Sequence, residues 1–283
     1  MGGGLLVFGQ TGQVATELRR QGDVLALGRD IADLREPEAC AAQIHARRPH
    51  AVINAAAWTA VDAAEEEEAA AHLVNAEAPG AMARACAELG CPFLHLSTDY
   101  VFDGSGTRPW QENDPTSPQN AYGRTKLAGE IAVREAGEHH VILRTAWVFS
   151  AHGANFVKTM LRLADNHDEV RVVADQFGGP TPADDIAAAL LQIAAAMQDG
   201  RVGGTYHFAG QPSVSWAAFA RAIFAHSGRP TAVAEVTTVD YPTPAARPFN
   251  SRLDCAKLQA DFGITPPDWH AGLIRMINEL DSR

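Results

Sequence analysis

Short apolar runs alternate with longer amphipathic segments along the first half of the chain. The apolar runs predict strands at residues 5–8, 24–27, 51–54, 93–96 and 141–144. The longer segments are rich in Ala, Leu, Glu and Arg, and they predict helices over residues 12–21, 37–47, 76–90 and 118–136. Strands that alternate with helices indicate an α/β fold, in which a doubly wound parallel sheet is covered by helices on both faces.

The pattern loses its regularity after about residue 150. Prolines interrupt it at Pro180, Pro182, Pro212, Pro230, Pro242, Pro244, Pro248, Pro266 and Pro267. A chain of 283 residues, 46% of them hydrophobic, can bury a large core and exceeds the commonest size of a single domain. We therefore expect a main domain in residues 1–150 and a smaller lobe in residues 151–283, interleaved with strands that return to the main sheet.

The charge and composition of the chain restrict its partners. A formal net charge of -11 argues against a nucleic-acid-binding protein, because such proteins present a broad basic face. No run reaches the ~18 apolar residues of a membrane span, and the first residues lack the basic start of a signal peptide. The four cysteines form no CxxC motif, which is typical of reduced thiols. We expect a cytoplasmic protein that binds neither nucleic acid nor membranes.

A glycine-containing turn follows the first predicted strand. It reads GQTGQVA over residues 9–15 and leads into the first predicted helix. Gly9 permits a tight turn, Gly12 lets backbone N–H groups approach a pyrophosphate, and Ala15, in place of a third glycine, still allows close packing. The turn predicts a Rossmann-like dinucleotide-binding domain in residues 1–150, with a purely structural strand–turn–helix as the alternative.

Two further strand ends bear on the choice of cofactor. After the second strand, Arg29 stands where an NAD-specific site usually places an acidic residue for the ribose 2′-hydroxyl. An arginine there favours a 2′-phosphate and hence NADPH, with NADH as the second candidate and a solvated arginine as the structural alternative. The third strand ends in NAAAWT at residues 54–59, a run made mostly of small residues. Small residues there would let a cofactor lie against the edge of the sheet. The alternative is that the alanines only allow close packing of helices.

A tyrosine and a lysine stand four positions apart in the motif NAYGRTKLAGE. The motif opens a predicted helix, where residues i and i+4 share a face, so Tyr122 and Lys126 project side by side. The lysine ammonium would lower the pKa of the tyrosine from about 10 and make the phenol an acid near neutral pH. Hydride transfer to a carbonyl leaves an alkoxide that needs such a proton, and Thr98 would hold its oxygen. The alternative is a tyrosine–lysine pair on a helix surface.

Several motifs, taken in order, carry a resemblance to a known family. They are GQTGQVA, NAAAWTAVD, STDYVFDG, PWQENDPTSPQNAYGRTKLAGE, RTAWVF and RPFNSRLD. With them the chain resembles the extended short-chain dehydrogenase/reductases over residues 4–280. The resemblance implies that Thr98, Tyr122 and Lys126 form the catalytic triad, with Tyr122 as the proton donor and Lys126 also holding the nicotinamide ribose. The implied reaction is the reduction by NADPH of the 4-keto group of dTDP-4-dehydro-L-rhamnose to give dTDP-L-rhamnose.

The same resemblance assigns the remaining binding residues. Its cofactor positions are Gly12, Gln13, Val14, Asp33, Leu34, Ala56, Ala57 and Thr59. Its sugar-nucleotide positions are Thr98, Asp99 and Trp147, and Asn155 and Arg247 match positions of the substrate-binding lobe that meet the nucleotide. Arg247 would supply the local positive charge that an acidic protein needs for an anionic ligand. Trp147 would stack on the sugar ring, with core packing as its alternative.

The resemblance leaves the metal content, the oligomeric state and part of the function open. Some members dimerise around a Mg²⁺ ion, and the matching residues here are Glu17, Asp184 and Glu279, with solvated carboxylates as the alternative. The expected state is a monomer or a homodimer. Among enzymes, the alternative function is a related nucleotide-sugar reductase or an epimerase with the same Tyr–Lys pair. Outside enzymes it is a catalytically idle regulatory subunit, against which the intact triad argues.

Overall fold

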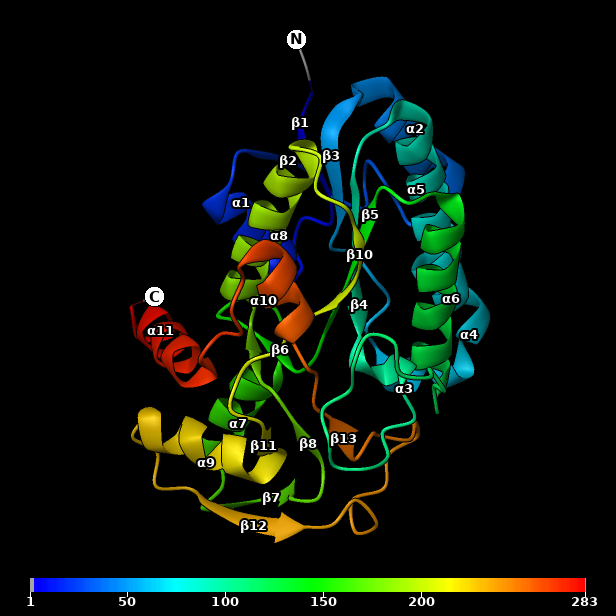
Figure 1. Cartoon of the computed structure of the whole chain (residues 1–283). Helices are drawn as coiled ribbons and strands as arrows, with labels where there is room; N and C mark the ends of the chain where they lie inside the picture. Colours follow the sequence, from blue (N-terminus) through cyan, green and yellow to red (C-terminus); the bar gives the residue numbers. More distant parts are fainter. Residues whose placement is uncertain (1–2, 283) are drawn as a thin grey trace.

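A six-stranded parallel sheet forms the centre of the protein, whose structure is a computed structural model that describes residues 3–282. The strands run in the order β10-β5-β4-β3-β1-β2 (Figure 1). They are β1 (Gly3–Phe8), β2 (Val24–Leu27), β3 (Pro49–Asn54), β4 (Phe93–Thr98), β5 (His140–Thr145) and β10 (Gly204–His207). The strands expected in the first half are all present, and their pairs are parallel. The predicted α/β fold with a Rossmann-like, doubly wound sheet is confirmed.

Helices cover both faces of the sheet, because its strands are apolar on both sides. One face carries α1 (Gln13–Gln21), α8 (Ala183–Gln198) and α10 (Ala256–Phe262), and the other carries α2 (Pro37–Arg47), α5 (Ala78–Leu89) and α6 (Ala121–Ala136) (Figure 1). Neighbouring residues of β1 show this division. Val7 belongs to the same buried cluster as Leu18 and Leu190, whereas Phe8 belongs to that of Ile44 and Met82.

The segment between β3 and α5 contains helices that the apolar pattern does not predict. It forms α3 (Val61–Glu66), α4 (Glu68–His72) and the π-helix η1 (Leu73–Glu77) before α5 begins. These elements pack on α6, where Glu65 Oε1 accepts a hydrogen bond from the N–H of Ala121 at 2.8 Å and Glu68 pairs with Arg124 at 2.7 Å. Their alanine- and glutamate-rich sequence has little apolar periodicity, so the pattern alone gives no boundaries for them.

The chain from β6 onward builds a lobe at one end of the main sheet and also returns to that sheet (Figure 1). The lobe contains β6 (Val148–Phe149), α7 (Phe156–Ala164), β7 (Glu169–Val173), β8 (Phe177–Gly178), β9 (Thr181–Pro182), β11 (Val214–Ser215), α9 (Trp216–His226), β12 (Ala232–Val236), β13 (Asn250–Ser251) and α11 (Trp269–Asp281). The strand β10 leaves the lobe and pairs with β5. The division of the chain at residue 150 stays a prediction.

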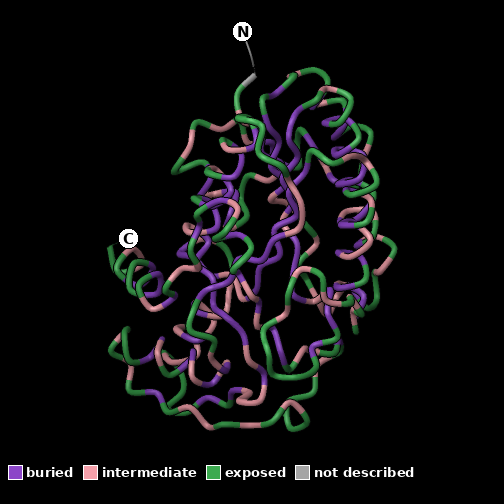
Figure 2. The backbone as a smooth tube through the Cα atoms, viewed as in Figure 1, coloured by how far each residue is buried: buried purple, intermediate pink, exposed green. Residues whose placement is uncertain are grey.

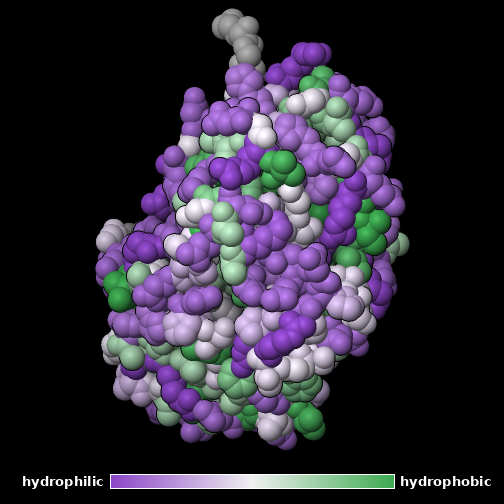
Figure 3. Space-filling model, viewed as in Figure 1, coloured by the Kyte–Doolittle hydropathy of each residue, from purple (hydrophilic) through white to green (hydrophobic). Residues whose placement is uncertain are grey.

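Buried segments run through the main sheet and continue into the lobe (Figure 2). Hydrophilic residues cover most of the face seen in Figure 3, as the charge of the chain leads one to expect. Within the described part of the chain, we find no helix with the length and apolar character that crossing a membrane requires.

Candidate active site

A cavity of about 760 Å³ follows the carboxyl ends of the strands at the centre of the main sheet. Doubly wound sheets bind ligands at this edge, where the strand order reverses, which here is between β1 and β3. The residues predicted to bind the cofactor all line this cavity: Gly9, Gly12, Gln13, Val14, Arg29, Asp33, Leu34, Ala56, Ala57, Thr59, Tyr122 and Lys126. The strand ends thus gather residues from separate motifs into one site.

The glycine turn brings the backbone close to this cavity. Gly9 has a φ of 112°, and a Cβ there would lie 3.3 Å from the backbone of Ala55. Gly12 is the N-cap of α1, and no side chain of the described residues caps this helix, so its first N–H groups are available to phosphate oxygens. Ala15 is fully buried, which shows that an alanine fits where the glycine pattern would place a third glycine. The turn fits the pyrophosphate of NADPH.

Two arginines stand where the cavity meets the loop after β2. Arg29 is exposed and lines the cavity, as a contact with a 2′-phosphate would require. Arg35 also lines the cavity. Its guanidinium pairs with the carboxylate of Asp33, with 2.6 Å between Arg35 Nη2 and Asp33 Oδ2. The hydrogen bonds from Arg35 keep the pKa of Asp33 below its ordinary value, so this carboxylate stays charged. Sequence reasoning missed Arg35, whose only signal is its position two residues after Asp33.

Tyr122 lies in the first turn of α6, as its motif predicts. The helix begins at the N-cap Asn120, whose side chain accepts a hydrogen bond from the N–H of Gly123 at 2.8 Å. Gly123 lets the helix approach the chain after β4, because a Cβ there would lie 2.3 Å from the carbonyl oxygen of Tyr100. Thr98 ends β4, where its Oγ1 donates to Asp99 Oδ1 at 3.1 Å, and it acts to lower the pKa of Tyr122. Close packing of helix on strand therefore brings these two predicted catalytic residues together.

The expected lowering of the Tyr122 pKa by Lys126 is absent from the structure, and this prediction is wrong. Burial raises the pKa of Tyr122 to about 12, although Thr98 acts in the opposite direction. Lys126 Nζ points instead to the carbonyl oxygen of Leu96 at 2.7 Å and to His95 Nε2 at 3.1 Å. The spacing of i and i+4 sets the two stems side by side, but it does not fix where a flexible lysine head points.

Two buried oxygens at the carboxyl edge of the sheet have no hydrogen-bond partner among the described residues. They are Thr145 Oγ1 and Asp99 Oδ2. Thr145 ends β5, lies beside Thr98 in the strand register and lines the cavity. Burial raises the pKa of Asp99 to about 6. Because buried polar atoms are rarely left unpaired, both oxygens indicate polar groups of a ligand. Sequence reasoning missed Thr145, although it stands in the motif RTAWVF.

Trp147 lies where the main sheet meets the lobe. Its φ of 52° falls in the left-handed region, which is uncommon for a bulky residue. The indole stacks on Trp216, with 3.5 Å between ring centroids and 11° between ring planes. Gly178 makes room for its edge, because a Cβ there would lie 2.7 Å from the indole Cε2. Protein therefore covers one face of the indole, in agreement with the packing alternative, and contact with a sugar stays a prediction.

Asn155 and Arg247 use their polar groups within the protein. The Asn155 side chain caps α7 by accepting a hydrogen bond from the N–H of Lys158, and it donates one to Gln13 Oε1 at 2.9 Å. Arg247 Nη2 donates to Asp62 Oδ2 at 2.7 Å, which ties the loop after β12 to α3. Asn155 thus orients Gln13, a predicted cofactor residue, and Arg247 neutralises a carboxylate. Their direct contact with the nucleotide stays a prediction.

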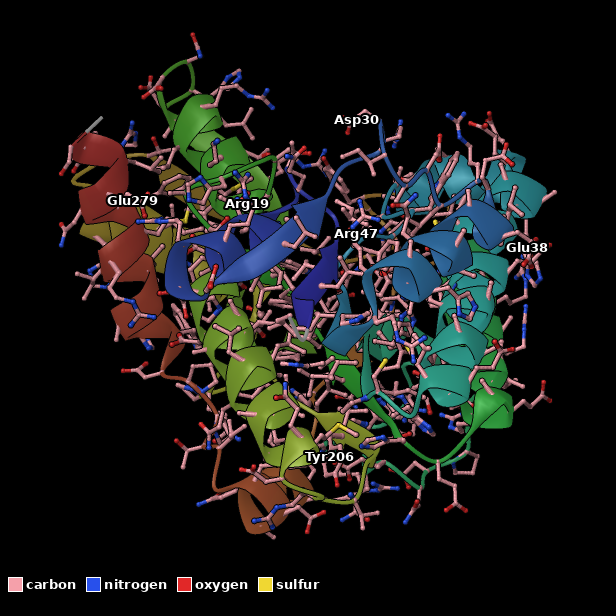
Figure 4. The ribbon with its side chains drawn as sticks, turned by 90° about the horizontal axis from the view of Figure 1, so that it is seen from above. Arg19, Asp30, Glu38, Arg47, Tyr206 and Glu279 are labelled. Carbon is pink, nitrogen blue, oxygen red and sulfur yellow. The ribbon has the colours of Figure 1, made fainter. Side chains whose placement is uncertain are left out.

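Two of the three carboxylates expected to hold Mg²⁺, Glu17 on α1 and Glu279 on α11, lie in one cluster with His152. Ligand atoms of Glu17, His152 and Glu279 all lie within 4.8 Å of one another. Arg20 Nη1 lies among them, 3.3 Å from Glu17 Oε1, 3.0 Å from His152 Nε2 and 3.0 Å from Glu279 Oε1. Figure 4 shows Glu279 on α11 beside α1, the helix that carries Glu17 and Arg20. A guanidinium therefore already supplies positive charge to the cluster.

Asp184, the third residue considered for Mg²⁺, pairs with Arg275 at 2.9 Å. Mg²⁺ demands a near-octahedral set of oxygen ligands at about 2.0–2.1 Å. The cluster offers an imidazole nitrogen and a guanidinium beside its carboxylates instead. These residues do not fit the Mg²⁺ ion that the resemblance implies.

Removal of divalent cations is expected to change neither the oligomeric state nor the thermal stability of the protein. We expect EDTA to alter neither the sedimentation coefficient nor the melting temperature, because Arg20 already bridges Glu17 and Glu279. Analytical ultracentrifugation and calorimetry, each with and without added MgCl₂, make the measurement. Dissociation or a lower Tm in EDTA, reversed by Mg²⁺, would contradict the assignment of Arg20 as the bridging cation.

The comparisons with known proteins agree with this geometry. A family model described as "RmlD substrate binding domain" matches residues 3–282. The chain is 46% identical to a dTDP-4-dehydrorhamnose reductase of Sinorhizobium fredii (strain NGR234), with 96% of each covered, and 44% identical to that of Escherichia coli (strain K12), with 98% of this chain and 97% of the relative covered. The structure of dTDP-4-dehydrorhamnose reductase from Bacillus anthracis in complex with NADP matches with a TM-score of 0.93 and 33% identity, over 99% of this chain and 100% of that chain. The chain therefore belongs to the family of dTDP-4-dehydrorhamnose reductases described by the RmlD substrate binding domain.

Proposed function

We propose that the protein reduces the 4-keto group of dTDP-4-dehydro-L-rhamnose to give dTDP-L-rhamnose, with NADPH as the cofactor. The observation that carries the proposal is a single cavity that joins the glycine turn after β1 to Tyr122 and Lys126. The names of the S. fredii and E. coli relatives support the substrate. The B. anthracis structure, which holds NADP, supports the cofactor.

The side chains at the end of β4 and the start of α6 supply the acid that such a reduction needs. NADPH, when bound, supplies the hydride for the carbonyl carbon. Tyr122 holds the proton for the carbonyl oxygen, because its raised pKa keeps the phenol protonated at neutral pH. Thr98 acts to lower the pKa of Tyr122, which favours the phenolate that remains after the proton has left. Thr98, Asp99 and Trp147 are proposed to contact the sugar nucleotide.

The proposed function is tested by following NADPH oxidation by its absorbance. The purified protein is offered dTDP-4-dehydro-L-rhamnose, its UDP counterpart and other dTDP-4-keto sugars. We expect turnover with dTDP-4-dehydro-L-rhamnose and a rhamnosyl product. NAD that remains bound through purification, without net consumption of NADPH, would identify an epimerase instead. Absence of turnover with every sugar would point to an idle subunit.

Arg29→Ala is expected to raise the KM for NADPH by roughly 10- to 150-fold and to leave the KM for NADH nearly unchanged. A charge-assisted contact with the 2′-phosphate is worth about 1.5–3 kcal/mol, which corresponds to this range. Steady-state kinetics with each cofactor make the measurement. Arg162→Ala is the matched control, because Arg162 is an exposed arginine on α7 outside the cavity. Equal effects of Arg29→Ala on both cofactors would rule out recognition of the 2′-phosphate.

We also propose that the protein acts in the cytoplasm, as a monomer or a homodimer. The cysteines support a reducing compartment, since Cys40, Cys86, Cys91 and Cys255 are all free and buried.

A further inference from the structure

The backbone of Trp147 has a strained conformation that the surrounding structure must hold. Its φ of 52° lies in the left-handed region, and a bulky residue keeps such a backbone only where its neighbours restrain it. The carbonyl oxygen of Trp147 accepts a hydrogen bond from the N–H of Thr181 at 3.0 Å, which restrains the main chain but not the ring. The ring stacks on Trp216, with 3.5 Å between centroids and 11° between planes. Trp216 is therefore the aromatic restraint on the indole.

Trp216 is itself fixed by the lobe. It is the first residue of α9, and the N-cap Ser215 accepts a hydrogen bond from the N–H of Ala218 at 3.1 Å. Ser215 lies in β11, which pairs with β8. The ring of Phe156, on α7, also packs on Trp216, with 4.5 Å between centroids. Trp216 thus joins the indole of Trp147 to the core of the lobe.

The edge of the indole lies close to a carboxylate that has an unpaired oxygen. A Cβ on Gly178 would lie 2.7 Å from Trp147 Cε2 and 3.0 Å from the Cβ of Ser251, so only a glycine fits between these side chains. Burial raises the pKa of Asp99 and Ser251 acts to lower it, which places Ser251 beside this carboxylate. Asp99 Oδ2 has no hydrogen-bond partner among the described residues, which indicates a polar group of a ligand. Trp147 therefore borders the place where that ligand would lie.

We propose that Trp216 is a positioning residue: its stack on Trp147 maintains the left-handed backbone of that residue and sets the indole against the sugar ring of the substrate. The role toward the sugar rests on the proposed function. Aromatic side chains cover the apolar C–H face of a sugar ring, and Trp147 is only half-buried, so part of its surface is open for this contact. Without Trp216, the backbone of Trp147 relaxes to a negative φ and the indole turns away from the sugar.

The conformation of Trp147 is the direct test, and it is read by NMR of protein labelled in its five tryptophans. Trp147→Phe assigns the Trp147 signals. We expect Cα and Cβ chemical shifts of a left-handed residue, and indole protons shifted upfield by the ring of Trp216. Both features should be lost in Trp216→Leu. A left-handed Trp147 in folded Trp216→Leu would overturn the proposal.

Phe219→Leu is the matched control for this test. Phe219 is 1% exposed on the same helix, and its ring packs on Trp269 with 5.2 Å between centroids. Its ring contacts within the described residues do not include Trp147. The change should lower the melting temperature and leave the Trp147 signals in place. Loss of the left-handed signals in both variants would mean that any damage to the lobe core releases Trp147, and it would refute the role of Trp216.

The consequence for the sugar is measured by calorimetric titration with dTDP-L-rhamnose and with dTDP, which lacks the sugar. We expect Trp216→Leu to weaken the binding of dTDP-L-rhamnose by roughly 10-fold, as loss of an aromatic contact does, and to leave the binding of dTDP nearly unchanged. Trp216→Phe keeps an aromatic ring and should restore most of the affinity. Equal losses for the two ligands, or no loss, would overturn the proposal.

Failure of the proposed function gives a different result. A wild-type protein that does not bind dTDP-L-rhamnose would refute the proposed substrate, and with it the contact of Trp147 with this sugar. The NMR measurement needs neither substrate nor turnover, so it tests the effect of Trp216 on Trp147 by itself. If Trp216→Leu does not fold, the wild-type spectrum decides, because a Trp147 without left-handed shifts would overturn the proposal.

Discussion

Tyr122→Phe is expected to lower kcat by about 10²-fold or more, while the fold and the affinity for NADPH stay close to those of the wild-type protein. The change removes the phenolic oxygen and keeps the ring, which packs edge-to-face on Tyr100 with 5.5 Å between centroids. General acid catalysis contributes about 10²–10⁴-fold, so loss of the proton donor removes at least about 2.7 kcal/mol of transition-state stabilisation. Stopped-flow turnover, cofactor titration and calorimetry on one preparation separate these quantities.

Tyr241→Phe is the matched control for this prediction. Tyr241 is 51% exposed in the loop after β12, so loss of its hydroxyl should change neither turnover nor stability. Near-normal turnover of Tyr122→Phe would remove Tyr122 from the role of proton donor. A lower melting temperature with normal kcat in the folded fraction would identify it as a packing residue.

The main sheet could be predicted from the sequence because each of its strands is marked locally. The strand β5 is buried along its whole length, so its apolar run reads as one segment between polar ends. The turn at Gly9 and Gly12 is equally local, since strand, turn and helix follow one another within a few residues. The edge of the sheet could then be assigned as the binding site from topology alone.

Contacts between distant segments could not be predicted in this way. Arg20 meets Glu279 across 259 positions, and neither residue carries a signal of the other, so a metal cluster and an ion pair look alike in the sequence. The direction of the Lys126 side chain could not be predicted either, because it too depends on residues that are distant in the sequence. It is set by His95, which lies opposite Asn54 only because of the strand register. The sequence identifies which residues reach the carboxyl edge, and the register decides what each of them touches.

Glu130→Ala is expected to lower the free energy of unfolding by about 3–5 kcal/mol, the usual cost of breaking a buried ion pair from one side. Glu130 is fully buried and receives hydrogen bonds from Ser97 at 2.6 Å, from Arg144 at 2.7 and 2.8 Å and from Arg134 at 2.6 Å. Its removal leaves the Arg144 guanidinium, which is 1% exposed, without a counter-charge. For a chain of this size the melting temperature should fall by on the order of 10 °C.

Glu135→Ala is the control for that change, because Glu135 is an exposed glutamate on the same helix. Its replacement should alter the free energy of unfolding by less than about 0.5 kcal/mol. A similar loss from both variants would mean that α6 responds to helix propensity or to surface charge, and not to the buried pair. Urea unfolding of the three proteins under one set of conditions makes the comparison.

Glu130→Gln tests whether charge, and not shape, carries this stabilisation. Burial alone would raise the pKa of Glu130, but the hydrogen bonds and charge of Arg144, with Ser97 and Arg134, lower it below the ordinary value of 4.5. A group with a lowered pKa in the folded state stabilises the protein above its ordinary pKa, and this stabilisation is lost as the pH falls through the folded value. The wild-type protein should therefore exceed Glu130→Gln in stability at neutral pH, and the difference should shrink as the pH falls below 4.5. A difference that is the same at every pH would mean that the amide fails to fit the space, because protonation makes the native carboxyl group the neutral analogue of glutamine.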